Sequence, residues 1–460
     1  MTRLVLVLLV TCQACQTPAA ATSHDTAFDV RPRPQAKNAI LITIEALRTD
    51  VLGSYGGRAS TPVLDSLAGR GWVFENCYSV TMLTNPSHAS IMTSLYPRDH
   101  GVYDNDSGIQ EGARTLATAL SRRGLRTGAV IGFPHLNPKV SNLGQGFDRV
   151  IPATAIERRA SETTTEALHL VDSYVPGERF FLWLHYVDPH APYEPEVPHR
   201  GDTGLAHTSD PMALAVRAAP DFQRHSPYFK QLFHDQKTIG PAINAYLGEV
   251  EAVDTALGEL VQGLESRGRL HDTALVVTAD HGENLGEHRM YFHHGGLYGE
   301  TVHVPLYVSL TGISPRRVAG LVESVDVAPT VLALVNAPRW EPMRGRSLVE
   351  LALGESPGRS VAMSEHMNGQ MVSARSMAAT LIWHRKSSAQ FPTYPLVAGK
   401  REFYDRVNDA GENRPRELVG PEAEKLTDAV LQYVGAGLRL AARPALERDL
   451  HSLRALGYSE

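Results

Sequence analysis

Acidic and histidine residues follow three apolar segments at the points where these segments end. A single carboxylate after a strand is as often a helix cap or a surface charge as a ligand. Three such ends at one edge of a sheet would instead bring oxygen ligands and imidazoles together around a divalent cation. The three groups are Glu45 after residues 38–44, His185 to His190 after residues 180–184, and Asp280-His281-Gly282-Glu283 after residues 275–278.

A hydroxyl group precedes an expected helix in the segment Thr84-Asn85-Pro86-Ser87-His88. The proline predicts a turn just before this helix, whose first-turn amides and dipole favour an anion. Thr84 would then face the place where a sulfate or phosphate group binds. The alternative is that Thr84 or Ser87 only caps the helix, which is the more common role of an isolated Thr or Ser at such a position.

A parallel sheet would place these residues at one edge. Nearly continuous apolar and β-branched runs predict strands buried on both faces, with helical patterns between them. The strands are expected at residues 38–44, 126–131, 180–185, 274–278 and 304–310, and helices at residues 114–123 and 242–266. We therefore expect an α/β fold, with a large mixed, mostly parallel sheet sandwiched by helices and ligands at its carboxyl edge.

The pattern changes after about residue 353. Short segments at residues 360–365, 371–383 and 401–407 predict antiparallel strands, and a helix is expected near residues 421–440. We therefore expect a catalytic α/β domain at residues 37–353 and a smaller C-terminal α+β domain at residues 354–460.

Residues 1–21 are typical of an export signal, because Arg3 precedes the apolar residues 4–10 and then small residues. This run is too short to span a bilayer, which takes about 20 residues in a helix. Cys12 or Cys15 would carry a lipid anchor in a lipoprotein, and a secretory signal cut near Ala21 is the alternative. Residues 22–36 are expected to be a linker. The mature chain is expected in the periplasm or cell envelope, or otherwise secreted.

The composition excludes several classes of protein. The 460-residue chain is 43% hydrophobic and 20% charged, so it can bury at least one large core. Its formal net charge of -6, without a long Lys or Arg run, offers no basic surface to a nucleic acid. After removal of a leader only Cys77 is certain to remain, which excludes a disulfide framework.

Several motifs resemble those of bacterial sulfatases and occur in the same order along the chain. Residues 84–97 are similar to the family's signature segment, a Cys or Ser followed by x-Pro-Ser-Arg, a helix and Tyr-Pro. The similarity covers nearly the whole chain from Lys37 onward, and this collinearity makes chance a poor explanation. The other motifs are Gly53-Ser54-Tyr55-Gly56, Thr61 to Ala68, Asp188-Pro189-His190, Thr278 to Glu283, Gly286-Glu287-His288, Asp326 to Thr330, Gly345 to Leu348, Phe403-Tyr404-Asp405 and Leu453 to Tyr458.

The resemblance implies an alkaline-phosphatase-like fold and assigns roles to individual positions. It makes Glu45, Asp280 and His281 metal ligands and Thr84 the nucleophile, with His88 where the family usually has Arg. His190 and one of two adjacent histidines fall where the family contacts the substrate anion or protonates the leaving group. The resulting candidates are His190 and His293 for catalysis, beside Thr84 and His88, and Asn105, His185 and His294 for substrate binding.

The nucleophile and the first ligand depart from the family pattern. Most sulfatases oxidise a Cys or Ser to formylglycine, an aldehyde that Thr84 cannot form by the same route. A Thr nucleophile implies a covalent ester that water then cleaves, which is easier for a phosphoryl than for a sulfuryl group. Glu45 stands where the family has Asp, and its extra methylene moves the carboxylate by roughly 1.5 Å. Ala46 stands where the family has a second acid.

We therefore expect a metal-dependent hydrolase of sulfate esters or of related phosphate or phosphonate esters. The alternatives are a phosphodiesterase or phosphotransferase of the same superfamily, and a catalytically silent envelope protein that binds glycans. Calcium, magnesium or manganese suit the oxygen ligands, and the His ligand leaves zinc open. The expected partner is a small-molecule or glycan ester, not a nucleic acid, and a membrane would be contacted only through an N-terminal lipid anchor.

Overall fold

The computed structural model describes residues 33–154, 157–226, 229–230, 236–366, 368–389, 394–436 and 441–445. The expected export signal, most of the expected linker and the motif from Leu453 to Tyr458 lie outside the described residues. Within the described residues, no helix has both the length and the apolar composition that crossing a membrane requires.

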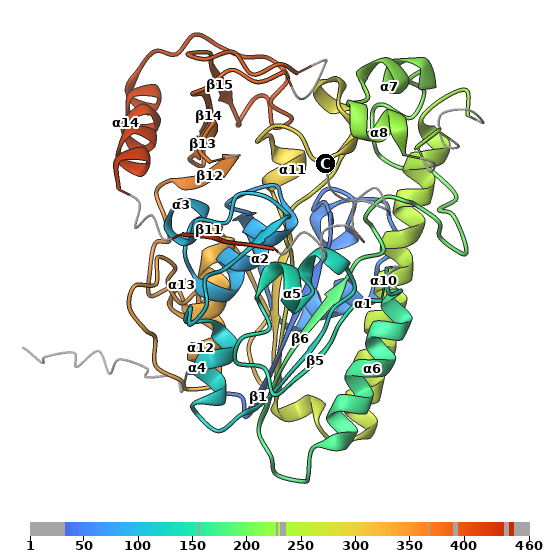
Figure 1. The fold of residues 1–460 in the computed structure, drawn as a ribbon, viewed down its shortest axis with the longest axis vertical. Helices are drawn as coiled ribbons and strands as arrows, with labels where there is room; N and C mark the ends of the chain where they lie inside the picture. Colours follow the sequence, from blue (N-terminus) through green and yellow to red (C-terminus); the bar gives the residue numbers. More distant parts are fainter. Residues whose placement is uncertain are drawn as a thin grey trace, which may run out of the picture. The chain divides into compact units, whose positions relative to one another are not determined.

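A mixed sheet of eight strands forms the centre of the fold (Figure 1). β1 (Asn38–Ile44) lies between β6 (Phe180–Tyr186) and β7 (Thr273–Ala279) and pairs with both in parallel. β10 (Leu306–Ser309) runs antiparallel to its neighbours. The order is β11-β2-β10-β7-β1-β6-β4-β5, with β2 at Trp72–Tyr78, β4 at Arg126–Val130, β5 at Arg149–Ile151 and β11 at Arg316–Glu323. The expectation of a large, mostly parallel sheet is confirmed.

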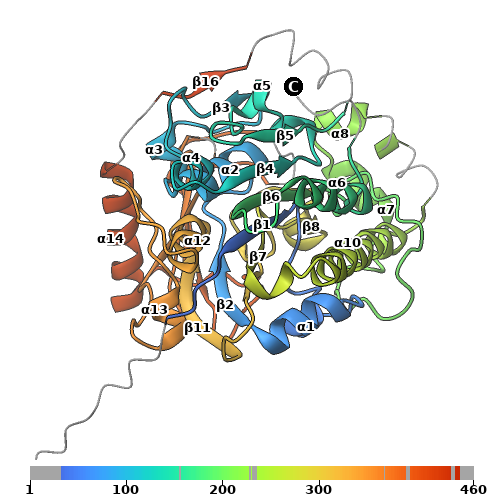
Figure 2. The ribbon, with the colours of Figure 1, turned by 90° about the horizontal axis from the view of Figure 1, so that it is seen from below.

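Helices cover both faces of this sheet, as Figure 2 shows. One face carries α1 (Pro62–Arg70), α6 (Ala160–Ser173) and α10 (Gly240–Ser266). The other carries α2 (Thr84–Thr93), α4 (Leu116–Ser121) and α12 (Val327–Leu334). Buried residues recur along α10 at helical spacing, as at Ile243, Val250, Leu257 and Leu264, so one side of this helix faces the core.

A second, antiparallel sheet follows and lies beyond one end of the large sheet's strands (Figure 1). Its order is β12-β13-β14-β15, and α14 packs against β13 and β14. The bounds are β12 at Ala362–His366, β13 at Met371–Arg375, β14 at Ala379–His384, β15 at Arg401–Asp405 and α14 at Pro421–Gly435. This is the predicted C-terminal α+β region, while the domain boundary at residue 353 stays a prediction.

The strand expected at residues 371–383 is in fact two strands joined by a tight turn. Ser376 Oγ accepts hydrogen bonds from the backbone N–H groups of Ala378 and Ala379, which folds the chain back on itself. The turn contains no Gly, Asn or Pro, so the usual sequence signal is missing. The predicted helix at residues 421–440 ends at Gly435.

Short α-helices and strands connect the longer elements. The helices are α3 (Pro97–His100), α5 (Pro138–Ser141), α7 (Met212–Ala218), α8 (Asp221–His225), α11 (Gly299–Val302) and α13 (Val349–Leu353). The strands are β3 (Ser107–Gly108), β8 (Asn284–Leu285), β9 (Tyr291–His293) and β16 (Arg443–Pro444). Of these, β8, β9 and α11 follow β7 directly and position the histidines described below.

Candidate active site

The carboxyl ends of β1 and β7 meet at one edge of the large sheet. Ile44, the last residue of β1, pairs with Ala279, the last residue of β7. The next residues along the two strands are Glu45 and Asp280, so the strand register alone places the two carboxylates close together. Both side chains, and that of His281, are completely buried.

Glu45, Asp280 and His281 form a compact group of potential ligands, because one ligand atom of each lies within 4.8 Å of the others. His281 Nε2 is 3.4 Å from Glu45 Oε1 and 3.3 Å from Asp280 Oδ2. Neither His281 Nε2 nor Asp280 Oδ2 has a hydrogen-bond partner among the described residues. Buried polar atoms are rarely left unpaired, so two such atoms beside a carboxylate fit a cation with oxygen and nitrogen ligands.

The protonation of this group also fits a cation. Burial and the charge of Glu45 raise the pKa of Asp280 well above its usual range. Burial alone would raise the pKa of Glu45, but the hydrogen bond with His185 and the nearby His281 imidazole hold it well below its usual range. Burial opposes the charge on His281, yet Asp280 and Glu45 raise its pKa to about 9. The His281 imidazole is therefore protonated at neutral pH, and a cation would displace a proton from it on binding.

A second group shares Glu45 and adds the imidazoles of His88 and His185. His185 Nε2 lies 2.8 Å from Glu45 Oε2 and so orients the carboxylate. His88 Nδ1 lies 2.9 Å from the Thr84 carbonyl oxygen, and Nε2 lies 3.0 Å from Thr43 Oγ1. A carbonyl only accepts hydrogen bonds, so Nδ1 carries the hydrogen and Nε2 accepts from the hydroxyl. His88 thus has no lone pair free, and the group with Asp280 and His281 suits a cation better.

Thr84 is the first residue of α2, and its side chain is buried. Its Oγ1 donates a hydrogen bond of 2.5 Å to Glu45 Oε1, and it does not cap the helix. Ser87 does not cap it either, since its hydroxyl donates to the Asp280 carbonyl oxygen. The prediction of a turn at Pro86 just before the helix is wrong, because Pro86 lies within the first turn of α2. Its missing N–H removes no helical hydrogen bond at this position.

Asn105 is not part of α2 but contacts Asn85 in the first turn of this helix. Its Oδ1 accepts a hydrogen bond of 2.9 Å from the backbone N–H of Asn85, and its carbonyl oxygen accepts another from Asn85 Nδ2. These contacts fix the residue that follows Thr84. A substrate contact by Asn105 stays a prediction.

Ala46 has a left-handed backbone, with φ of 53°, which costs a residue other than glycine roughly 1–2 kcal/mol. Two hydrogen bonds hold this conformation. The Ala46 N–H donates to Asp280 Oδ1 at 3.2 Å, and the Ala46 carbonyl oxygen accepts from the Tyr246 hydroxyl at 2.9 Å. The backbone amide of Ala46 thus helps to orient Asp280.

Histidines from two loops lie together beside this group. The ring centres of His294 and His281 are 4.2 Å apart, and those of His294 and His190 are 5.6 Å apart. His190 Nδ1 lies 3.5 Å from Glu157 Oε1. Burial would lower the pKa of His190, but this carboxylate raises it to about 8. His293, at the end of β9, is buried, and burial lowers its pKa to about 3.

Sequence reasoning missed the acidic partners of these histidines. Glu283 is buried, with Oε1 3.6 Å from His294 Nδ1 and Oε2 accepting from the Tyr193 hydroxyl at 2.9 Å. Glu283 stands in the predicted segment that begins at Asp280, so its position was a usable signal. Glu157 precedes α6 in a segment with no pattern that points to a site.

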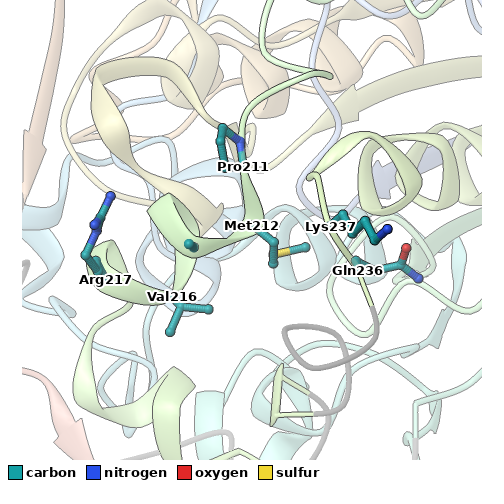
Figure 3. Close-up of a pocket in the computed structure, with 7 residues that line it drawn as sticks. Pro211, Met212, Val216, Arg217, Gln236 and Lys237 are labelled. Carbon is teal, nitrogen blue, oxygen red and sulfur yellow. The ribbon is translucent and has the colours of Figure 1, made fainter.

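A separate pocket of about 470 Å³ lies beside α7 (Figure 3). Arg217 and Lys237 lie on opposite sides of it. It contains none of the candidate residues, so we place the chemistry in the buried group instead. The lining residues are Pro211, Met212, Ala213, Val216, Arg217, Gln236 and Lys237.

Comparison with known proteins identifies the family of the chain. The sulfatase family model matches residues 37–337. An arylsulfatase of Clostridium perfringens is 23% identical over 398 residues, which cover 72% of this chain and 82% of the relative. The multifunctional alkaline phosphatase superfamily protein PehA of Trinickia caryophylli is 25% identical over 400 residues, which cover 68% of this chain and 76% of the relative.

Solved structures share the fold. BT4656, in complex with its substrate D-glucosamine-2-N,6-O-disulfate, superposes with a TM-score of 0.68 at 20% identity and covers 88% of this chain and 97% of its own. A phosphonate monoester hydrolase from Silicibacter pomeroyi gives a TM-score of 0.66 at 22% identity, over 86% of this chain and 94% of its own. The chain therefore belongs to the sulfatase family of the alkaline-phosphatase superfamily and is a hydrolase of the sulfuric ester type.

Proposed function

We propose that this chain hydrolyses an ester of an anionic tetrahedral group, with Thr84 as the nucleophile beside a divalent cation. Glu45, Asp280 and His281 would hold the cation. The observation that carries the proposal is the 2.5 Å hydrogen bond from Thr84 Oγ1 to Glu45 Oε1, within a buried group whose unpaired atoms fit a cation.

The residues around Thr84 have separable roles in this proposal. A bound divalent cation would polarise the substrate oxygen and lower the pKa of the Thr84 hydroxyl. Glu45 Oε1 is the acceptor of the Thr84 hydroxyl proton, while His185 holds the other oxygen of Glu45. Calcium, magnesium and manganese suit the oxygen ligands, and His281 leaves zinc open.

In the first step, Thr84 Oγ1 forms a bond to sulfur or phosphorus while the bond to the alcohol or phenol oxygen breaks. The Thr84 proton passes to Glu45 Oε1, and the leaving oxygen takes a proton from His190. We favour His190 over His293 as this acid because Glu157 raises the pKa of His190 to about 8, whereas burial lowers that of His293 to about 3. His294, beside His281, would contact the substrate anion.

In the second step, water attacks the same sulfur or phosphorus and the bond to Thr84 Oγ1 breaks. One proton of the water returns to His190, and Glu45 returns its proton to Thr84. Sulfate or phosphate then leaves, and the site is restored.

A phosphate or phosphonate ester is the second candidate substrate. Thr84 itself favours it, because its hydroxyl must form a covalent ester that water then cleaves, without the formylglycine on which most sulfatases depend. The fold shared with a phosphonate monoester hydrolase makes this class a natural one to test. The fold is also shared with a protein solved with a sulfated glucosamine, which makes glycan sulfates the other class.

The decisive experiment compares the full chain with Thr84→Ala and Thr84→Ser on 4-nitrophenyl sulfate, phosphate and phosphonate esters, with each of the four metals. Thr84→Ala should lower turnover of every substrate by about 1,000-fold or more, while Thr84→Ser keeps a nucleophilic hydroxyl and much of the activity. Unchanged activity in Thr84→Ala would refute the assignment. A chain that binds glycan sulfate but turns over no ester would favour the silent binding protein.

Export of the chain, with or without a lipid anchor at Cys12 or Cys15, also stays a proposal. It rests on the leader-like residues 1–21. Fractionation of cells that express the full chain should place it in the envelope or the medium, and the anchored form should incorporate labelled fatty acid only while the modified Cys is present.

A further inference from the structure

The loop that carries His294 continues through two glycines into a segment that the second sheet holds. Gly295 and Gly296 follow His294, and glycine backbones have wide conformational freedom. On one side, the Gly295 N–H donates to Asn284 Oδ1 at 2.7 Å. The position of His294 therefore also depends on what holds the chain just after Gly296.

Three consecutive residues after this glycine pair are each bound by a side chain from the second sheet or the loop after it. The buried Arg375, at the end of β13, donates to the Leu297 carbonyl oxygen. Glu402 of β15 accepts a hydrogen bond of 2.8 Å from the Tyr298 hydroxyl.

The third contact comes from Glu412, in the loop after β15, whose Oε2 accepts from the Gly299 N–H at 3.0 Å. Glu412 also lies 3.2 Å from Arg375, and Thr380 Oγ1 donates to its other oxygen. Arg375, Glu412 and Glu402 are buried. Such charges stay in the interior only when they are paired and hydrogen-bonded, so the arrangement is rigid.

We infer that the second sheet positions His294 by holding residues 297–299. This inference rests on the proposed contact of His294 with the substrate anion, and it makes Tyr298 and its partner Glu402 positioning residues. Loss of the Tyr298 contact would leave this segment held only through Leu297 and Gly299, and would let the His294 ring shift relative to His281. A displacement of about 1 Å can cost on the order of 100-fold in rate.

The chain offers a closely matched pair of variants. The hydroxyls of Tyr298 and Tyr404 both donate to the same oxygen of Glu402, Oε2. Tyr298 lies in the histidine loop, whereas Tyr404 lies on β15 itself. Tyr298→Phe and Tyr404→Phe therefore each remove one phenol hydroxyl from the same buried carboxylate, and only the first removes one of the three contacts that hold residues 297–299.

Hydrogen exchange and turnover test the inference together. Tyr298→Phe should increase amide exchange across residues 293–299 and lower kcat/KM by about tenfold or more. Tyr404→Phe should leave exchange in this loop unchanged and kcat/KM within about twofold. In a His294→Ala background, Tyr298→Phe should lower kcat/KM no further, since its effect acts through His294.

Equal amide exchange of residues 293–299 in the two variants would overturn the inference. So would an undiminished effect of Tyr298→Phe in the His294→Ala background. If His294→Ala alone is fully active, the role proposed for His294 fails, whereas the exchange comparison still decides whether the second sheet holds the loop.

Discussion

Thr84 Oγ1 lies 2.5 Å from Glu45 Oε1, and this hydrogen bond joins the candidate nucleophile to the candidate metal ligands. Glu45 extends from the end of β1, whereas Thr84 begins α2. One oxygen of the Glu45 carboxylate accepts from the Thr84 hydroxyl, and the other lies 2.8 Å from His185 Nε2. The longer side chain at position 45 therefore makes direct contact with the unusual nucleophile.

Glu45→Asp tests whether the site requires this longer side chain. The substitution withdraws the carboxylate by roughly 1.5 Å, against a ligand tolerance of about 0.2 Å. We expect weaker binding of Mn²⁺ in a calorimetric titration and lower turnover. Glu75→Asp, in a partly exposed ion pair with Arg317, is the control and should bind like the wild type. Unweakened binding by Glu45→Asp would contradict the geometry.

His185→Ala removes the hydrogen bond that orients Glu45 but removes no proposed ligand. Loss of such a supporting partner typically lowers metal affinity or activity by about 10–100-fold, and we expect an effect of this size. The exposed His271 provides the control, since His271→Ala should change neither quantity. Equal behaviour of the two variants would mean that His185 does not support Glu45.

The pH dependence of turnover should report His190. Glu157 raises the pKa of His190 to about 8, so the ring is protonated at neutral pH and loses its proton as the pH rises through that value. We expect kcat/KM of the wild type to fall above about pH 8. For His190→Gln we expect kcat/KM to be about 100- to 10,000-fold lower and to show no such decline. Glu157→Gln should move the decline to lower pH. A decline that persists in His190→Gln would assign it to another group.

The motif that begins at Asp326 has a structural role that a stability measurement can check. Arg359 donates to both oxygens of Asp326 and lies 3.1 Å from Glu323. Both carboxylates are completely buried. Arg359→Ala removes the cation that both buried carboxylates share, so we expect the free energy of unfolding to fall by about 3–5 kcal/mol in urea titrations. A loss below about 1 kcal/mol would show that the pair is dispensable.

The sequence predicted the large sheet well because its strands are buried on both faces and therefore read as continuous apolar runs. The predicted strand ends placed Glu45 and Asp280 at the same edge of the sheet, and the pairing of Ile44 with Ala279 makes them neighbours. The hairpin at Ser376 escaped prediction because a serine side chain replaces the usual turn residues there. Local sequence gave no signal for that turn.

The histidine environment was harder to predict because it depends on contacts between distant segments. Glu157, before α6, contacts His190, after β6, and Glu283 contacts both His294 and Tyr193. Residue types alone left His293 and His294 equivalent. In the structure, His294 differs from His293 by its contacts with His281 and Glu283, and burial lowers the pKa of His293 to about 3.

Metal analysis of the purified full chain decides whether Glu45, Asp280 and His281 hold a cation. We expect about one divalent ion per chain by mass spectrometry. Chelation should remove both the ion and the activity, and restoring one metal should return both. Asp280→Asn should purify with little metal, because an amide replaces the charged ligand. A metal-free chain that still hydrolyses its best ester substrate would show that the reaction needs no bound cation.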